Sequence, residues 1–157
     1  MAFGLVRRNA KSIKSGPPVS ISSYQSEGHF SSEVSQVLSE LLVREPGATV
    51  AVIAKSPEYA ERFYGNLPEV PGIRLVNDGN FTFLPGIDVT DVTQVKGLEF
   101  DYVVIPDAMS AVYPDTEESR RKLHVAATRA IHQLWVISIG KASPLVSSFV
   151  PEEDLST

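Results

Sequence analysis

Apolar residues along this chain follow two different spacings, one typical of strands and the other typical of helices. Short apolar or alternating runs predict strands, because successive side chains of a strand point to opposite faces. Two of these runs, 49–54 and 102–105, are almost continuously apolar, which is typical of parallel strands covered on both faces. The predicted strands are residues 19–23, 49–54, 87–92, 102–105 and 134–139.

Three segments between these strands repeat apolar residues every three or four positions, which predicts helices. The first repeats them from Val34 to Leu42 and stops before Pro46, and the third has an apolar stripe from Leu123 to Ile131. The expected start signals are Ser31 or Ser32 for the first helix, Ser56 and Pro57 for the second, and a capping box of Asp115 and Glu118 for the third.

The order of these elements predicts the fold class. Residues 68–86 are rich in Pro, Gly and Asn, and they predict a short strand at 73–76 followed by a hairpin that includes 81–84. Strands that alternate with helices indicate an α/β domain with a mostly parallel sheet. Ligands of such sheets bind beyond the carboxyl ends of the strands. Trp135 lies inside the last predicted strand, and we expect it in the core.

Composition and charge narrow the class of protein. The length of 157 residues indicates one domain, and the absence of cysteine excludes disulfides and thiolate metal sites. A formal net charge of -5 argues against a domain that holds nucleic acid by bulk electrostatics alone. No apolar run is long enough to span a bilayer and no signal peptide is visible, so we expect a cytoplasmic protein. We expect a basic lead-in or linker at 1–17, the folded domain at 18–145 and an acidic tail at 146–157.

Two segments contain residues suited to ligand binding. In Lys96-Gly97-Leu98-Glu99 the glycine permits a tight turn or a close approach, and the carboxylate can accept hydrogen bonds from hydroxyls such as those of a ribose. On spacing alone, the same tetrapeptide fits a surface turn between two strands. Arg129 lies off the apolar stripe of the third helix, and its guanidinium suits phosphate oxygens, although a solvated or salt-bridged arginine fits this position as well.

Taken together, the two segments resemble a known family. Residues 96–101, KGLEFD, precede one apolar strand, and residues 125–130, VAATRA, precede the next, as in motifs V and VI of superfamily-one DNA helicases of the UvrD, Rep and PcrA type. Residues 22–26, SSYQS, resemble motif IV of that family. The resemblance covers about residues 19–140 and implies the second, C-terminal RecA-like domain of such an enzyme, with a three-layer P-loop NTPase-like fold. Within that family the chain most resembles the HelD-like branch.

The resemblance also implies roles for particular residues. Arg129 would contact the γ-phosphate of ATP, Glu99 would contact the ribose, and Gly97 would allow close approach beside them. Gln25 stands where motif IV of the family supplies a second arginine to the phosphates, so it can donate a hydrogen bond but no charge. Thr93 and Lys96 would contact single-stranded DNA.

The chain lacks two motifs that bind ATP and magnesium. There is no Gly-x-x-x-x-Gly-Lys-Ser/Thr loop and no acidic pair suited to a Walker B site. In the resembled enzymes both belong to the N-terminal RecA-like domain, so ATP with Mg²⁺ would be bound mainly by that partner domain. This chain alone would not hydrolyse ATP. His29, His124 and His132 have no ligand-like spacing, and no metal site is expected.

The sequence leaves more than one function open. The first is the C-terminal motor domain of an ATP-dependent DNA helicase or translocase. The alternative is a helicase-like interaction module that binds or remodels a large partner such as RNA polymerase, which the acidic balance and Gln25 favour. A third is a free-standing nucleotide-binding α/β domain.

Overall fold

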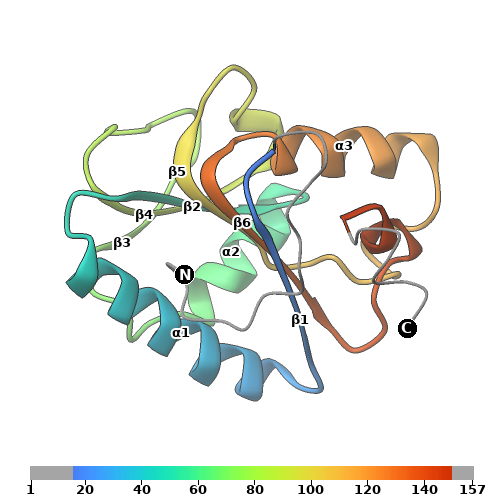
Figure 1. Cartoon of the computed structure of the whole chain (residues 1–157), viewed down its shortest axis with the longest axis horizontal. Helices are drawn as coiled ribbons and strands as arrows, with labels where there is room; N and C mark the ends of the chain where they lie inside the picture. The colour runs from blue at the N-terminus through green and yellow to red at the C-terminus, as the bar shows by residue number, and fades with distance from the viewer. Residues whose placement is uncertain (1–15, 150–157) are drawn as a thin grey trace.

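A six-stranded parallel sheet forms the centre of the computed structural model, which describes residues 16–149 (Figure 1). The strand order is β1-β6-β5-β2-β4-β3, and every neighbouring pair is parallel. This confirms the predicted α/β class with a mostly parallel sheet. The strands are β1 Val19–Tyr24, β2 Thr49–Ala54, β3 Ile73–Leu75, β4 Gly86–Asp91, β5 Phe100–Ile105 and β6 Ala130–Ile139.

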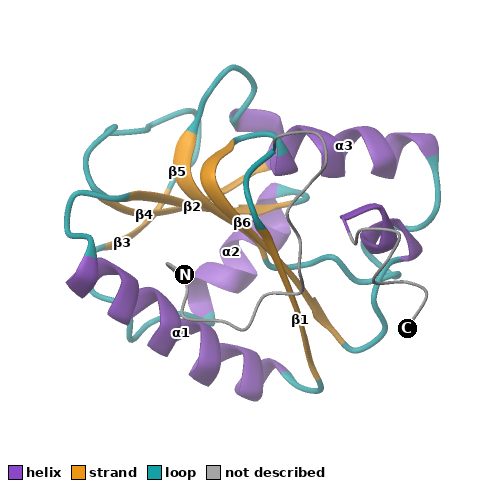
Figure 2. Ribbon diagram, in the orientation of Figure 1, coloured by secondary structure: helices purple, strands orange, loops and turns teal. Residues whose placement is uncertain are grey.

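Helices cover both faces of this sheet and give the domain three layers (Figure 2). α1 Glu27–Arg44 and α2 Pro57–Gly65 pack on one face, where their apolar residues join a core that includes Trp135. α3 Glu117–Ala127 packs on the other face over a second core. The side chain of Trp135 is completely buried, as predicted. Because both faces are covered, functional side chains can reach solvent at the two ends of the strands. We call the side of the sheet where the strands begin its amino edge and the side where they end its carboxyl edge.

The observed start of α2 agrees with the prediction, whereas the starts of α1 and α3 differ from it. Ser56 caps α2 by accepting a hydrogen bond from the Tyr59 amide, and Pro57 occupies the first turn. α1 starts earlier than predicted, because Ser26 is its N-cap and the apolar stripe extends back to Phe30. α3 is capped by Thr116, which accepts from the Ser119 amide, so the predicted capping box was wrong.

Two other segments depart from the predicted elements. Residues 81–84 form no strand, since no neighbouring strand offers them backbone partners, and the predicted hairpin is absent from this stretch. Ala130 and Ile131, predicted to extend the third helix, are the first residues of β6 instead. The helix ends at Ala127, and the chain turns there so that β6 can pair with β5 from Ala130 to Val136.

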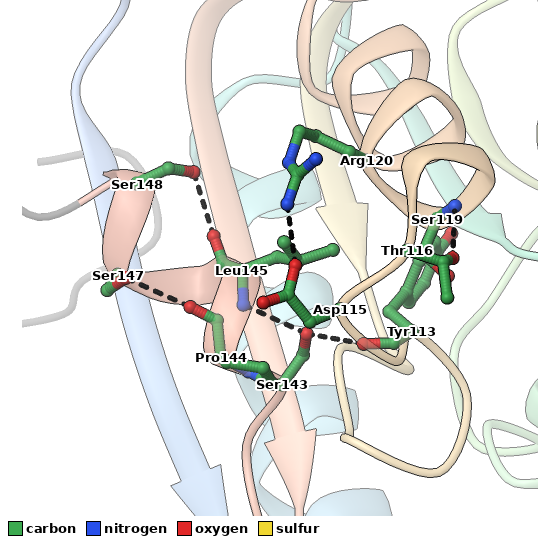
Figure 3. Close-up of polar contacts among 10 residues, drawn as sticks. All are labelled: Tyr113, Asp115, Thr116, Ser119, Arg120, Ser143, Pro144, Leu145, Ser147 and Ser148. Carbon is green, nitrogen blue, oxygen red and sulfur yellow. Dashed lines mark hydrogen bonds and ion pairs between the residues drawn. The ribbon is translucent and has the colours of Figure 1, made fainter.

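The end of the described chain packs against the loop that precedes α3 (Figure 3). A 3-10 helix, η2 Pro144–Phe149, buries Leu145 and Val146 in the second core. Ser143 joins it to the loop: its hydroxyl donates to the Tyr113 carbonyl at 2.6 Å and accepts from the Leu145 amide at 3.1 Å. Asp115 pairs with Arg120 at 2.5 Å. The folded domain therefore continues past the predicted boundary at residue 145.

Some predictions fall on residues that the structure does not describe. Most of the predicted lead-in, residues 1–15, and the last part of the predicted tail, residues 150–157, lie outside the described residues. Within residues 16–149, no helix has both the length and the apolar content needed to cross a membrane.

Candidate functional site

The segment between β4 and β5 crosses the sheet from one edge to the other. β4 ends at Asp91 on the carboxyl edge, whereas β5 begins at Phe100 on the amino edge. A short 3-10 helix, η1 Val92–Gln94, starts the crossing, and Val95 is buried on the same face as α3. Consequently Thr93 lies at the carboxyl edge, and Glu99 lies at the amino edge.

The turn that precedes β5 is open to solvent. Gly97 has a φ of 81°, a conformation that favours glycine because a Cβ would be strained there. Lys96, Gly97 and Glu99 are all exposed, whereas Leu98 is half-buried. The turn at Gly97 is therefore followed by an exposed Glu99 at the amino edge.

Arg129 lies in the short turn between α3 and β6. Its guanidinium donates to the Val125 carbonyl at 3.0 Å, to the Leu98 carbonyl at 3.4 Å and to the Thr128 hydroxyl at 3.0 Å. These acceptors are all neutral, and no carboxylate of residues 16–149 pairs with this half-buried cation. Its positive charge therefore remains available to an anion from outside the described chain.

The structure brings Glu99 and Arg129 to one edge of the sheet. The Phe100 amide donates to the Arg129 carbonyl at 2.9 Å, so the residue after Glu99 is bonded directly to the backbone of Arg129. The contact of the guanidinium with Leu98 is a second link between the two segments. Parallel pairing of β5 with β6 is the cause, because it aligns the amino ends of these strands.

Gln25 lies at the opposite edge, contrary to the shared phosphate site predicted for it and Arg129. Gln25 follows the carboxyl end of β1, where Tyr24 pairs with Ile139, whereas Arg129 precedes the first residue of β6. At about 3.3 Å per residue, the length of β6 separates the two side chains by roughly 30 Å. Gln25 is exposed, but it cannot reach a phosphate that Arg129 contacts.

The two predicted DNA-binding residues differ in what they can donate. Asp91 is buried, and its carboxylate accepts from the Thr93 amide at 2.9 Å, from the Thr93 hydroxyl and from the Gln94 side chain at 2.7 Å. The hydroxyl hydrogen of Thr93 is therefore used inside the chain. Lys96 is exposed, so its ammonium group can contact a phosphate.

The carboxyl edge holds a buried carboxyl group, that of Asp107. Asp107 is fully buried; one carboxyl oxygen accepts from the Lys55 amide at 2.8 Å, and the other has no hydrogen-bond partner. Burial raises the pKa of Asp107 to about 7, although the hydrogen bond from Lys55 opposes the shift. The hydroxyl of Tyr113 is also buried without a partner, and burial raises its pKa too.

Lys55 lies beside these buried polar groups. Its ammonium group donates to the Val112 carbonyl at 2.5 Å and lies 5.2 Å from the centre of the Tyr113 ring. Burial of a polar side chain directly after an apolar strand could not be inferred from the pattern, because such positions are usually solvated. Among residues 16–149, no group of three or more His, Asp or Glu side chains is arranged to hold a metal ion.

Comparison with known proteins finds similarity to helicase domains. The family model of the UvrD-like helicase C-terminal domain matches residues 86–137, a stretch that contains Glu99 and Arg129. No curated protein matches the chain.

Two solved structures have a similar fold. One is the C-terminal domain of a possible DNA helicase from Lactobacillus plantarum WCFS1, with a TM-score of 0.69, 27% identity and coverage of 89% of this chain and 84% of that one. The other is the UvsW helicase from bacteriophage T4, with a TM-score of 0.53, 7% identity and coverage of 82% of this chain and 50% of that one; it shows likeness of fold alone. Together, the family match over residues 86–137 and the 27% identical structure support a UvrD-type helicase C-terminal domain.

Proposed function

We propose that this domain is the C-terminal motor domain of an ATP-dependent DNA helicase or translocase and that its amino edge is one wall of an interdomain ATP site. The observation that supports this most directly is Arg129, a half-buried cation with no carboxylate partner among the described residues, beside the exposed Glu99. A guanidinium fixed by neutral acceptors retains donors and its full charge for phosphate oxygens.

The residues of this edge fit the part of ATP that the proposal assigns to them. Arg129 would donate to the terminal phosphate, and Glu99 would accept from the ribose hydroxyls. ATP with Mg²⁺ would supply the phosphoryl group whose transfer to water, with release of ADP, drives the motor. A companion RecA-like domain would make most of the phosphate contacts, since this chain has no Walker A loop. Closure of the two domains over the nucleotide would move the protein along a single strand.

Substitution of Glu99 tests the ribose contact. In the full-length protein that contains this domain, Glu99→Ala is expected to raise the KM for ATP by about ten- to a hundredfold, because a hydrogen bond to a charged group contributes roughly 1.5–3 kcal/mol. The KM for 2′,3′-dideoxy-ATP should be the same in the wild type and in Glu99→Ala, because that nucleotide lacks the ribose hydroxyls that Glu99 would contact. Glu69→Ala, which removes an exposed carboxylate elsewhere, is the control. An equal loss for both nucleotides would refute the assigned contact.

We also propose that Lys96 contacts a phosphate of single-stranded DNA. The net charge of -5 makes bulk attraction to DNA weak, so individual cations should account for much of the binding. Lys96→Ala is therefore expected to lower the affinity for single-stranded DNA to the same extent whatever the DNA sequence. It should also reduce the slope of log affinity against log salt concentration by about 1. Arg44→Ala, an exposed cation at the end of α1 on the other face, should leave the slope unchanged. An unaltered slope for the lysine variant would exclude the contact.

A further inference from the structure

The segment predicted as a hairpin instead presents exposed apolar side chains. Phe83 is 69% exposed and Leu84 is 60% exposed, although both are large apolar residues. Phe83 also has a φ of 58°, a backbone conformation that residues other than glycine, asparagine and aspartate seldom adopt. Strained residues of this kind cluster at binding sites, so this ring deserves a functional explanation.

Hydrogen bonds hold this segment in place. The guanidinium of Arg74 donates to the carbonyls of Leu84 and Pro85, both at 3.2 Å, and to the buried carboxylate of Asp88 at 2.7 Å. The Leu84 amide donates to the Thr82 hydroxyl at 3.3 Å. The exposed ring of Phe83 is therefore carried on a fixed backbone, which reduces the entropy that ordering would cost when a ligand binds.

Phe83 lies along the same edge of the sheet as Glu99 and Arg129. Two ring contacts connect it to that site: its ring is 6.1 Å from that of Phe81, which is 5.9 Å from that of Phe100. Phe100 follows Glu99 and donates its amide to the Arg129 carbonyl.

The strand order determines the spatial order of Arg129, Glu99 and Phe83 along the amino edge. Arg129 precedes β6, Glu99 precedes the neighbouring β5, and the segment with Phe83 precedes β4, which is separated from β5 only by β2. With about 4.8 Å between neighbouring strands, Glu99 lies between Arg129 and Phe83. A nucleotide has the same linear order of phosphate, ribose and base.

We propose that Phe83 stacks on the base of the nucleotide, an inference that rests on the proposed function. With the terminal phosphate at Arg129 and the ribose at Glu99, the base continues along the edge toward Phe83. A planar base would extend the row of rings formed by Phe100, Phe81 and Phe83. Every base has a π-face, so this contact strengthens binding without selecting one base strongly.

The test compares nucleotides with and without a base in the full-length protein. Phe83→Ala is expected to raise the KM for ATP about tenfold while kcat is retained, because stacking on an aromatic side chain is lost. The inhibition constant of ribose 5′-triphosphate, which has no base, should not change. Phe83→Trp should keep the wild-type KM or lower it. Val43→Ala, which removes an apolar side chain that is 82% exposed on α1, is the control.

The results separate this inference from the function on which it rests. If Phe83→Ala weakens ATP and ribose 5′-triphosphate equally, or neither of them, the stacking contact is refuted. An equal loss would mean that the ring contacts protein instead. Arg129→Ala is measured in the same assay: if it abolishes turnover while Phe83→Ala has no effect, only the base contact fails, whereas unchanged turnover in Arg129→Ala would refute the ATP site itself.

Discussion

Replacing Arg129 with alanine is expected to lower DNA-stimulated ATP turnover of the full-length protein by about 10³-fold or more, the range for an arginine that stabilises charge during phosphoryl transfer. The reason is the position of its guanidinium, which is half-buried at the amino edge and bonded only to neutral acceptors. Arg129→Lys should also lose most of the activity, because an ammonium group cannot donate to the Leu98 carbonyl and to a phosphate through one rigid fork.

The control for this prediction is a measurement of the thermal stability of each Arg129 variant. Arg129 also bonds to two backbone carbonyls, so the thermal unfolding midpoint of each variant should be measured beside kcat. A folded variant with unchanged turnover would contradict the proposed role. If the wild-type protein showed no DNA-stimulated turnover and co-purified stably with RNA polymerase, the interaction module would become the better account.

Asp107→Asn is expected to change how stability depends on pH. Burial raises the pKa of Asp107 from 3.8 to about 7, so the neutral carboxyl is favoured in the folded state. Its contribution is fully present below pH 3.8 and is lost as the pH rises through about 7. A shift of this size corresponds to about 4 kcal/mol of unfolding free energy.

The measurement is urea unfolding of this 157-residue chain at several pH values. Relative to Asp107→Asn, the wild type should lose stability as the pH rises, because the amide of the variant stays neutral and can still accept from the Lys55 amide. Asp115→Asn, which alters an exposed carboxylate, should follow the wild type. Parallel curves for wild type and Asp107→Asn would show that Asp107 is not buried as described.

Much of the fold could be predicted because its strands are short, apolar and separated by helical spacing. The cap of α2 was predictable for a local reason, since Ser56 and Pro57 are adjacent to the helix they start. The start of α1 was missed because Ser31 and Ser32 also suit an N-cap; the cap at Ser26 and the buried Phe30 show that the helix begins earlier. The pattern at 81–84 alternates like a strand, but Phe83 and Leu84 remain largely exposed.

The site was harder to predict because sequence order does not show which edge of a sheet a residue reaches. Gln25 and Thr93 both follow strands and remain at the carboxyl edge, whereas Glu99, six residues after Thr93, has crossed to the amino edge. The proximity of Glu99 and Arg129 follows from the pairing of β5 with β6, which a single sequence does not show. The environment of Asp107 likewise involves Lys55, whose amide donates to its carboxylate from 52 positions earlier in the chain.

The most direct test of the central claim is a structure of the full-length protein with a non-hydrolysable ATP analogue. We predict that the Arg129 guanidinium will lie within hydrogen-bond distance of the γ-phosphate and that the Glu99 carboxylate will contact the ribose. A bound nucleotide with Arg129 still directed only at the Leu98 and Val125 carbonyls, out of reach of every phosphate, would contradict the account.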